Sequence, residues 1–166
     1  SRNVSFQGSQ AELSARLDLP ATPPLAYAIF AHCFTCSKEV RAATYASAAL
    51  SGKGVAVLRF DFTVLGRSGG EFANTNFSSN VEDLIAAADW LRNNHQAPAL
   101  LVGHSLGGTA VLAAAARIPE TKAVATIGSP FDPAHVLRHL QESIAAIERD
   151  GEATVDIASR AFLVRR

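Results

Sequence analysis

Apolar and polar residues follow two different periods along the chain. Near the N-terminus they alternate over residues 3–7 and 12–19, on either side of Gly8-Ser9, which predicts a β-hairpin. Later segments are apolar without alternation, as in strands of a parallel sheet that is covered on both faces. These segments are 25–31, 55–60, 100–102 and 124–127. Helical periodicity occurs between them, over 39–50, 81–91 and 109–117. Strands alternating with helices predict right-handed βαβ crossovers and a mostly parallel sheet, an α/β fold.

A long polar segment interrupts this alternation. Residues 61–80 are rich in Gly, Ser, Thr and Asn, and a loop of this length in a compact domain is often functional. It ends in Ser79-Asn80-Val81-Glu82, a capping-box pattern that predicts a helix start. After the last apolar strand, Asp132-Pro133 predicts another helix. Residues 152–166 are expected to form a strand pair.

Composition narrows the class of protein. A chain of 166 residues with 48% hydrophobic and 18% charged residues is expected to form one globular domain. Fifteen basic and fifteen acidic residues cancel, so nothing suggests a nucleic acid or an anionic membrane as partner. No apolar run approaches the ~20 residues of a membrane span, and the N-terminus does not resemble a secretion signal, so we expect cytoplasmic residence.

The run Gly103-His104-Ser105-Leu106-Gly107-Gly108 is the strongest candidate for chemistry. It lies between an apolar strand and an alanine-rich helix, which is where a serine on a tight turn has its hydroxyl exposed above a sheet. The glycines tolerate a cramped backbone and close neighbours. The pattern predicts Ser105 as a nucleophile, whereas the alternative is a serine that only caps the helix.

A serine nucleophile also needs donors for the oxyanion that it creates. The Leu106 N–H is expected at a helix N-terminus, facing the developing charge. A second donor is expected from the loop after an earlier strand, here residues 32–38, with the Phe34 N–H as the candidate. His32 is expected to support this oxyanion loop.

Together these residues resemble the α/β-hydrolase superfamily. Residues 103–108 are similar to its nucleophile elbow, the His32 loop to its oxyanion loop, and residues 61–70 to the glycine-rich loop after its fourth strand, with Val64 where a glycine is usual. More narrowly, the chain resembles the bacterial hydrolase domain found fused to, or beside, an OsmC-like domain. The resemblance implies an esterase-type serine hydrolase that acts on a small ester or related acyl substrate without a cofactor, with an OsmC-like domain as a candidate partner.

The resemblance also implies an acid and a histidine that have no matching positions here. In the superfamily these follow the last strands, so we expect them beyond Arg166, with the last strands of the fold missing. Residues 133–166 are expected to begin a cap or lid insertion within the single domain 1–166. The sheet edge left open predicts a poorly soluble or homodimeric chain.

Other polar residues have simpler interpretations. His104 adjoins Ser105 and is expected to be a supporting residue of the site, but neighbours on a turn point apart, so a direct bond between the two side chains is not expected. His135 and His139 share a helix face without a third metal ligand, so no metal site is predicted. His95 is expected at a helix end and Asp61 as an acceptor that organises its loop. Asp132 follows the last apolar strand, where the superfamily's catalytic acid is one alternative, but a helix cap is the preferred interpretation.

Cys33 and Cys36 leave a rival function open. A C-x-x-C between a strand and a helix is also the layout of thioredoxin-like redox proteins. The preferred interpretation packs both cysteines into the oxyanion loop, where a disulfide would act as a switch on hydrolysis. A non-catalytic binding module is the third alternative.

Overall fold

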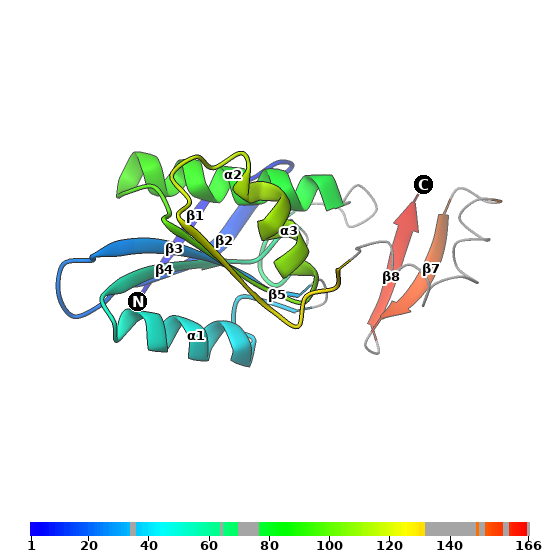
Figure 1. Ribbon diagram of the computed structural model, residues 1–166. Coiled ribbons are helices and arrows are strands. Elements are labelled where there is room, and N and C mark those ends of the chain that lie inside the picture. The colour runs from blue at the N-terminus through cyan, green and yellow to red at the C-terminus, as the bar shows by residue number, and fades with distance from the viewer. Residues whose placement is uncertain are drawn as a thin grey trace.

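The computed structural model describes residues 1–33, 36–63, 65–69, 77–131, 149, 152–157 and 160–165. Six strands form one sheet and two more form a separate hairpin. Along the chain the elements are β1 (Arg2–Gln7), β2 (Glu12–Asp18), β3 (Ala26–Ala31), α1 (Arg41–Ser51), β4 (Val55–Phe60), α2 (Phe77–Asn94), β5 (Leu100–His104), α3 (Leu106–Ala115), β6 (Ala123–Ile127), β7 (Glu152–Ile157) and β8 (Arg160–Arg165) (Figure 1).

The sheet is antiparallel at one side and parallel at the other. Its order is β1-β2-β4-β3-β5-β6, in which β1, β2 and β4 pair antiparallel while β4, β3, β5 and β6 run parallel. The chain therefore steps to one side of β3 to make β4 and to the other side to make β5. A crevice forms outside the carboxyl ends of parallel strands where the order reverses in this way.

Helices cover both faces of the sheet (Figure 1). On one face, buried residues of the central strands pack against α1 through Ala28, Phe30, Ala43, Val57 and Val102. The alternate residues of the same strands, such as Ile29, Leu58 and Leu101, point to the other face and pack with α2 and α3. Burial on both faces explains why these strands are apolar without alternation.

Most of the expected elements are confirmed. The N-terminal hairpin, the four parallel strands and the strand pair after residue 152 all form. The helix expected to end at 50 continues to Ser51 and is followed by Gly54, whose φ of +84° lets the chain turn into β4. The described part of the chain contains no helix that is both long and apolar enough to cross a bilayer.

One expected boundary is wrong. Ser79 does not cap α2, because the helix already begins at Phe77. Phe77 packs against the main apolar cluster, and this contact explains why the helix begins three residues before the start that a cap at Ser79 would give. The helix expected from Asp132-Pro133 lies outside the described residues.

Candidate active site at the carboxyl edge of the sheet

Four loops meet at one edge because their strands are parallel. His32 follows β3, Asp61 follows β4, Ser105 follows β5 and Ser129 follows two residues after β6. The edge thus brings together the three segments that the sequence singled out, the elbow, the His32 loop and the loop that starts at Asp61.

Ser105 has an unusual backbone. Its φ of 55° and ψ of −127° make it the only non-glycine residue with positive φ in the described part of the chain. Its N–H donates to the Ile127 carbonyl at 2.9 Å, and its own carbonyl accepts the Gly108 N–H at 2.9 Å. These two bonds hold the sharp turn between β5 and α3.

Three glycines make this turn sterically possible. A Cβ on Gly103 would lie 2.4 Å from the Gly107 oxygen, and one on Gly107 would lie 2.4 Å from the His32 oxygen. A Cβ on Gly108 would lie 2.6 Å from the Ser129 Cβ. The glycines therefore bring the elbow, the His32 loop and the end of β6 into direct contact.

Leu106 is the first residue of α3, so its N–H is one of the four that a helix leaves without an intrahelical acceptor. A small, shallow hollow adjoins it, and part of this hollow is open to solvent. Its lining residues are His32, Phe62, Asn80, Leu106, Gly107 and Ala110. The positive end of α3 therefore faces a space bordered by His32 and by the first residues after β4.

His32 is almost fully buried and interacts with the loop that follows it. Its Nδ1 lies 2.7 Å from the Cys33 carbonyl oxygen, which can only accept, so Nδ1 carries the proton. Its Nε2 is 3.8 Å from Asp61 Oδ1, too far for a hydrogen bond, and has no hydrogen-bond partner among the described residues. Burial lowers the pKa of His32 below its ordinary value of 6.5, although the Cys33 carbonyl and the Asp61 carboxylate favour the charged ring. The ring is therefore neutral at pH 7.

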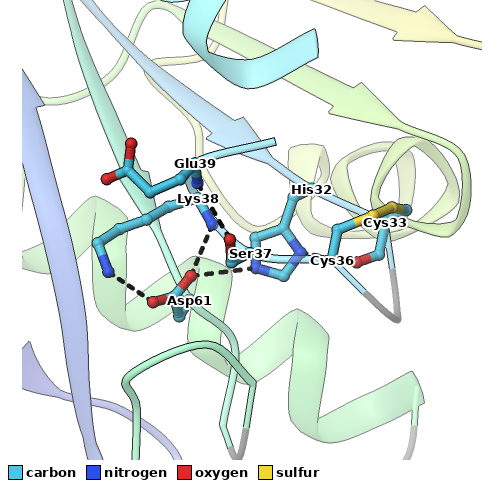
Figure 2. The surroundings of a disulfide bond; sticks show 7 residues. All are labelled: His32, Cys33, Cys36, Ser37, Lys38, Glu39 and Asp61. Carbon is cyan, nitrogen blue, oxygen red and sulfur yellow. Dashed lines mark hydrogen bonds and ion pairs between the residues drawn. A yellow bond between two sulfur atoms is a disulfide. The ribbon is translucent and has the colours of Figure 1, made fainter. Parts of the chain in front are cut away.

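A buried ion pair between Lys38 and Asp61 fixes the far end of the His32 loop (Figure 2). Asp61 Oδ2 accepts a hydrogen bond from Lys38 Nζ at 2.5 Å, and Oδ1 accepts one from the Lys38 backbone N–H at 2.6 Å. The Lys38 carbonyl in turn accepts a hydrogen bond from the Arg59 guanidinium. Lys38 is thus held through its side chain, its amide and its carbonyl.

The same carboxylate organises its own loop, as the sequence predicted. Asp61 Oδ2 also accepts the Arg67 N–H at 2.9 Å, and the Asp61 carbonyl accepts the Ser68 hydroxyl at 2.6 Å. Gly66 has a φ of +54°, and a Cβ there would lie 2.2 Å from the carboxyl carbon of Asp61. Lys38 as the partner of this carboxylate was missed, since nothing in a sequence separation of 23 residues indicates the contact.

Asp83 also has a buried carboxylate, and the sequence analysis did not single out this residue. Its Oδ1 accepts the N–H and the hydroxyl of Ser9, and its Oδ2 accepts the N–H and the hydroxyl of Thr63, all at 2.7–2.9 Å. It joins α2 to the N-terminal hairpin and to the loop after β4. Its helical position beside apolar residues offered the one available signal, a charge on the buried face of α2.

Cys33 and Cys36 form a disulfide directly after His32 (Figure 2). The Cys36 N–H donates to the Cys33 carbonyl at 3.0 Å, so a hydrogen bond joins the two residues as well as the disulfide. Helix α1 begins only at Arg41, so neither cysteine lies at a helix N-terminus. This differs from the thioredoxin-like layout, in which the helix dipole lowers the pKa of the attacking thiol.

Of the remaining candidates, the structure describes two histidines. His104 ends β5, and its buried Nδ1 has no hydrogen-bond partner in the described part of the chain. His95 follows α2, as expected, and stacks on Tyr27 near the start of β3, at the opposite edge from Ser105. The other four candidates, Phe34, Asp132, His135 and His139, lie outside the described residues.

The sheet order, the helices on both faces and the elbow define an α/β-hydrolase fold. The chain matches the family described as serine aminopeptidase, S33, over residues 25–150, and it belongs to that family.

Solved structures give the same fold. The esterase domain of a Rhodothermus marinus protein is 51% identical, with a TM-score of 0.72, over 99% of this chain and 64% of that one. An α/β serine hydrolase without a lid from Xanthomonas campestris is 28% identical, with a TM-score of 0.72, over 80% of this chain and 63% of that one. The esterase Est1E of Butyrivibrio proteoclasticus, solved with ferulic acid, is 24% identical, with a TM-score of 0.74, over 96% of this chain and 66% of that one, and shows the fold alone. The chain thus spans less than two thirds of the length of the first two structures. The search of curated protein sequences found no match to this chain.

Proposed function

We propose that the protein is an esterase-type serine hydrolase that cleaves a small carboxylic ester or related acyl compound through Ser105. The observation that carries the proposal is the backbone of Ser105, with φ of 55° and ψ of −127° between β5 and α3. A strained serine at such a strand-to-helix turn costs stability, and its benefit is an exposed hydroxyl beside a helix N-terminus.

The proposed reaction has two halves. The Ser105 hydroxyl oxygen attacks the carbonyl carbon, and its proton passes to a base and then to the departing alcohol, which leaves an acyl-enzyme. Water then attacks the same carbon and releases the acid and the free serine. In both halves the carbonyl oxygen becomes negative, and the Leu106 N–H at the start of α3 is proposed to stabilise it together with the Phe34 N–H.

The proposed base lies outside the described residues. His32 holds its proton on the Cys33 carbonyl, and His95 stacks on Tyr27 at the opposite edge of the sheet. Neither is therefore assigned to Ser105. The resemblance to α/β hydrolases instead implies a histidine after the last strands. A cap over residues 133–166 and an OsmC-like partner domain remain predictions.

An active-site label tests the nucleophile. A fluorophosphonate probe phosphonylates an activated serine and loses fluoride, and mass spectrometry of peptides then locates the label. We expect the full-length protein to be labelled at Ser105, and Ser105→Ala to lose both labelling and hydrolysis of p-nitrophenyl acetate.

Ser129→Ala is the matched control, because Ser129 lies at the same edge but contacts Thr109 at 3.1 Å. The Ser129→Ala variant should still be labelled at Ser105 and should keep its esterase activity. Full activity in Ser105→Ala would contradict the proposal, and a folded protein without labelling or hydrolysis would favour the binding-module alternative.

A further inference from the structure

The Cys33–Cys36 disulfide occupies a position where it can act on the proposed oxyanion loop. Both cysteines are partly exposed, so a small thiol in solution can reach them. Their Cα atoms are 5.2 Å apart, and the bond encloses residues 34 and 35. The expected second oxyanion donor, the Phe34 N–H, belongs to this enclosed pair.

The segment before the disulfide is fixed by close packing and a hydrogen bond. The carbonyls of Ala31 and His32 lie against Gly107 so closely that a Cβ there would come within 2.5 Å of either oxygen. The His32 ring holds the next carbonyl, that of Cys33, at 2.7 Å. The beginning of the loop is thereby tied to the elbow that carries Ser105.

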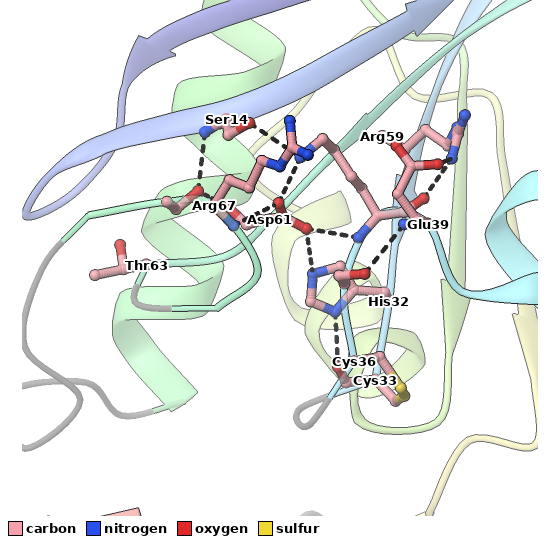
Figure 3. A network of polar contacts seen from close by, with 12 residues as sticks. Ser14, His32, Cys33, Cys36, Glu39, Arg59, Asp61, Thr63 and Arg67 are labelled. Carbon is pink, nitrogen blue, oxygen red and sulfur yellow. Dashed lines mark hydrogen bonds and ion pairs between the residues drawn. A yellow bond between two sulfur atoms is a disulfide. The ribbon is translucent and has the colours of Figure 1, made fainter.

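The segment after the disulfide is fixed by buried charges (Figures 2 and 3). Lys38 is held by Asp61 through its amide and its ammonium group, and by Arg59 through its carbonyl. The two cross-linked cysteines therefore lie between two segments that are fixed by other contacts. The cross-link itself spans four residues, so it restricts the unfolded chain little, and its main effect is on local geometry.

We propose that the Cys33–Cys36 disulfide is a thiol-exchange site for dithiol reductants, and that its opening lowers turnover at Ser105. This inference rests on the proposed esterase function. In the oxidised form the cross-link ties together the two residues that flank the expected Phe34 donor, and in the reduced form this tie is lost. Oxyanion stabilisation depends on donors that are positioned beforehand, so the loss falls on kcat rather than on KM.

The exchange is a two-electron reaction that balances with the dithiol alone. One thiolate of the reductant attacks a sulfur of the disulfide, forms a mixed disulfide and releases the other cysteine as a thiolate. The second thiol of the reductant then attacks the mixed disulfide, which releases the first cysteine and leaves the reductant as a cyclic disulfide. The protein gains two electrons and two protons, and the dithiol loses them.

The experiment compares oxidised and dithiothreitol-reduced full-length protein. Ester hydrolysis is measured for both, and alkylation with mass spectrometry counts the free thiols. Residues 1–166 contain only these two cysteines, so within this part of the protein the reductant acts nowhere else. Losing one oxyanion donor costs ~100-fold or more in kcat, and a donor that is loosened rather than lost should cost roughly tenfold.

The Cys33→Ala, Cys36→Ala double variant separates this effect from a direct action of the reductant. It should have the lower kcat of the reduced protein and be insensitive to dithiothreitol. Re-oxidation of the reduced wild-type protein with diamide should restore the rate of its oxidised form. Circular dichroism and thermal unfolding should be nearly the same for both redox states.

The proposal is overturned if reduction changes kcat by less than twofold, or if the double variant keeps the oxidised rate. It is also overturned if reduction unfolds the protein, since the disulfide is then a general brace. Ser105→Ala, assayed alongside, distinguishes the two hypotheses. An activity that requires Ser105 but ignores reduction refutes the disulfide site alone, whereas an activity that does not require Ser105 refutes the proposed function.

Discussion

Replacing Lys38 with methionine removes a buried charge while keeping the length of the side chain. The Lys38 ammonium group is almost fully buried and contacts Asp61 Oδ2 at 2.5 Å and Ser14 Oγ at 3.0 Å. In Lys38→Met the Asp61 carboxylate stays buried and loses its counter-ion. The variant should therefore be much less stable than the change in volume alone implies.

The remaining contacts of Asp61 set the magnitude. Breaking a buried ion pair by removing one partner typically costs 3–5 kcal/mol. Two backbone donors still reach the carboxylate, the N–H groups of Lys38 and Arg67. We therefore expect a loss of ~3 kcal/mol, which corresponds to a decrease of roughly 6–12 °C in the melting temperature of a domain of this size.

Urea unfolding followed by circular dichroism measures this loss. Lys53→Met is the matched control, because Lys53 is exposed beyond the end of α1, and it should change the free energy of unfolding by less than ~0.5 kcal/mol. Adding Asp61→Asn to Lys38→Met should recover at least ~1 kcal/mol relative to the sum of the single changes, because no unpaired charge remains. If Lys38→Met costs less than ~1 kcal/mol, the carboxylate does not depend on its counter-ion and the reasoning fails.

Three further predictions concern the elbow, the pH response and the sheet edge. Gly107→Ala places a Cβ 2.4–2.5 Å from two carbonyl oxygens. It should lower the free energy of unfolding, measured by chemical denaturation, by at least ~2 kcal/mol and abolish esterase activity. Gly52→Ala is the control, because its Cβ would have its nearest atom at 3.4 Å, and it should be neutral or stabilising. Burial lowers the pKa of His32 in the folded protein below its ordinary value of 6.5, so the unfolded chain takes up a proton first as the pH falls. The free energy of unfolding should therefore be constant above about pH 7 and decrease below about pH 6.5. A His32→Gln variant with the same dependence of unfolding free energy on pH would refute this assignment. The β6 edge of the sheet, where Ile127 is 43% exposed, should make a protein of residues 1–166 dimerise or aggregate, as light scattering would detect. Ile127→Lys should reduce that association. A wild-type protein of residues 1–166 that stays monomeric at high concentration would contradict the prediction.

The parts of the fold that follow local rules could be predicted from the sequence. The buried strands were identifiable because both of their faces are apolar, and the turn at Ser105 because glycines occur at the positions where backbones touch. The disulfide was left open, since C-x-x-C spacing is compatible with free thiols as well. Lys38 and Asp61 lie 23 residues apart and Ser9 and Asp83 74 apart, so their contacts depend on the folded chain. The start of α2 was misplaced because burial of Phe77 outweighed a favourable capping pattern.

The positive φ of Ser105 sets stability and activity against each other at a single residue. A side chain in such a conformation costs of order 1–3 kcal/mol, which glycine avoids. Ser105→Gly should therefore raise the melting temperature while removing the proposed nucleophile. A laboratory selection for heat resistance alone would be expected to recover this substitution, and each thermostable variant would then need an activity screen before it could be called improved.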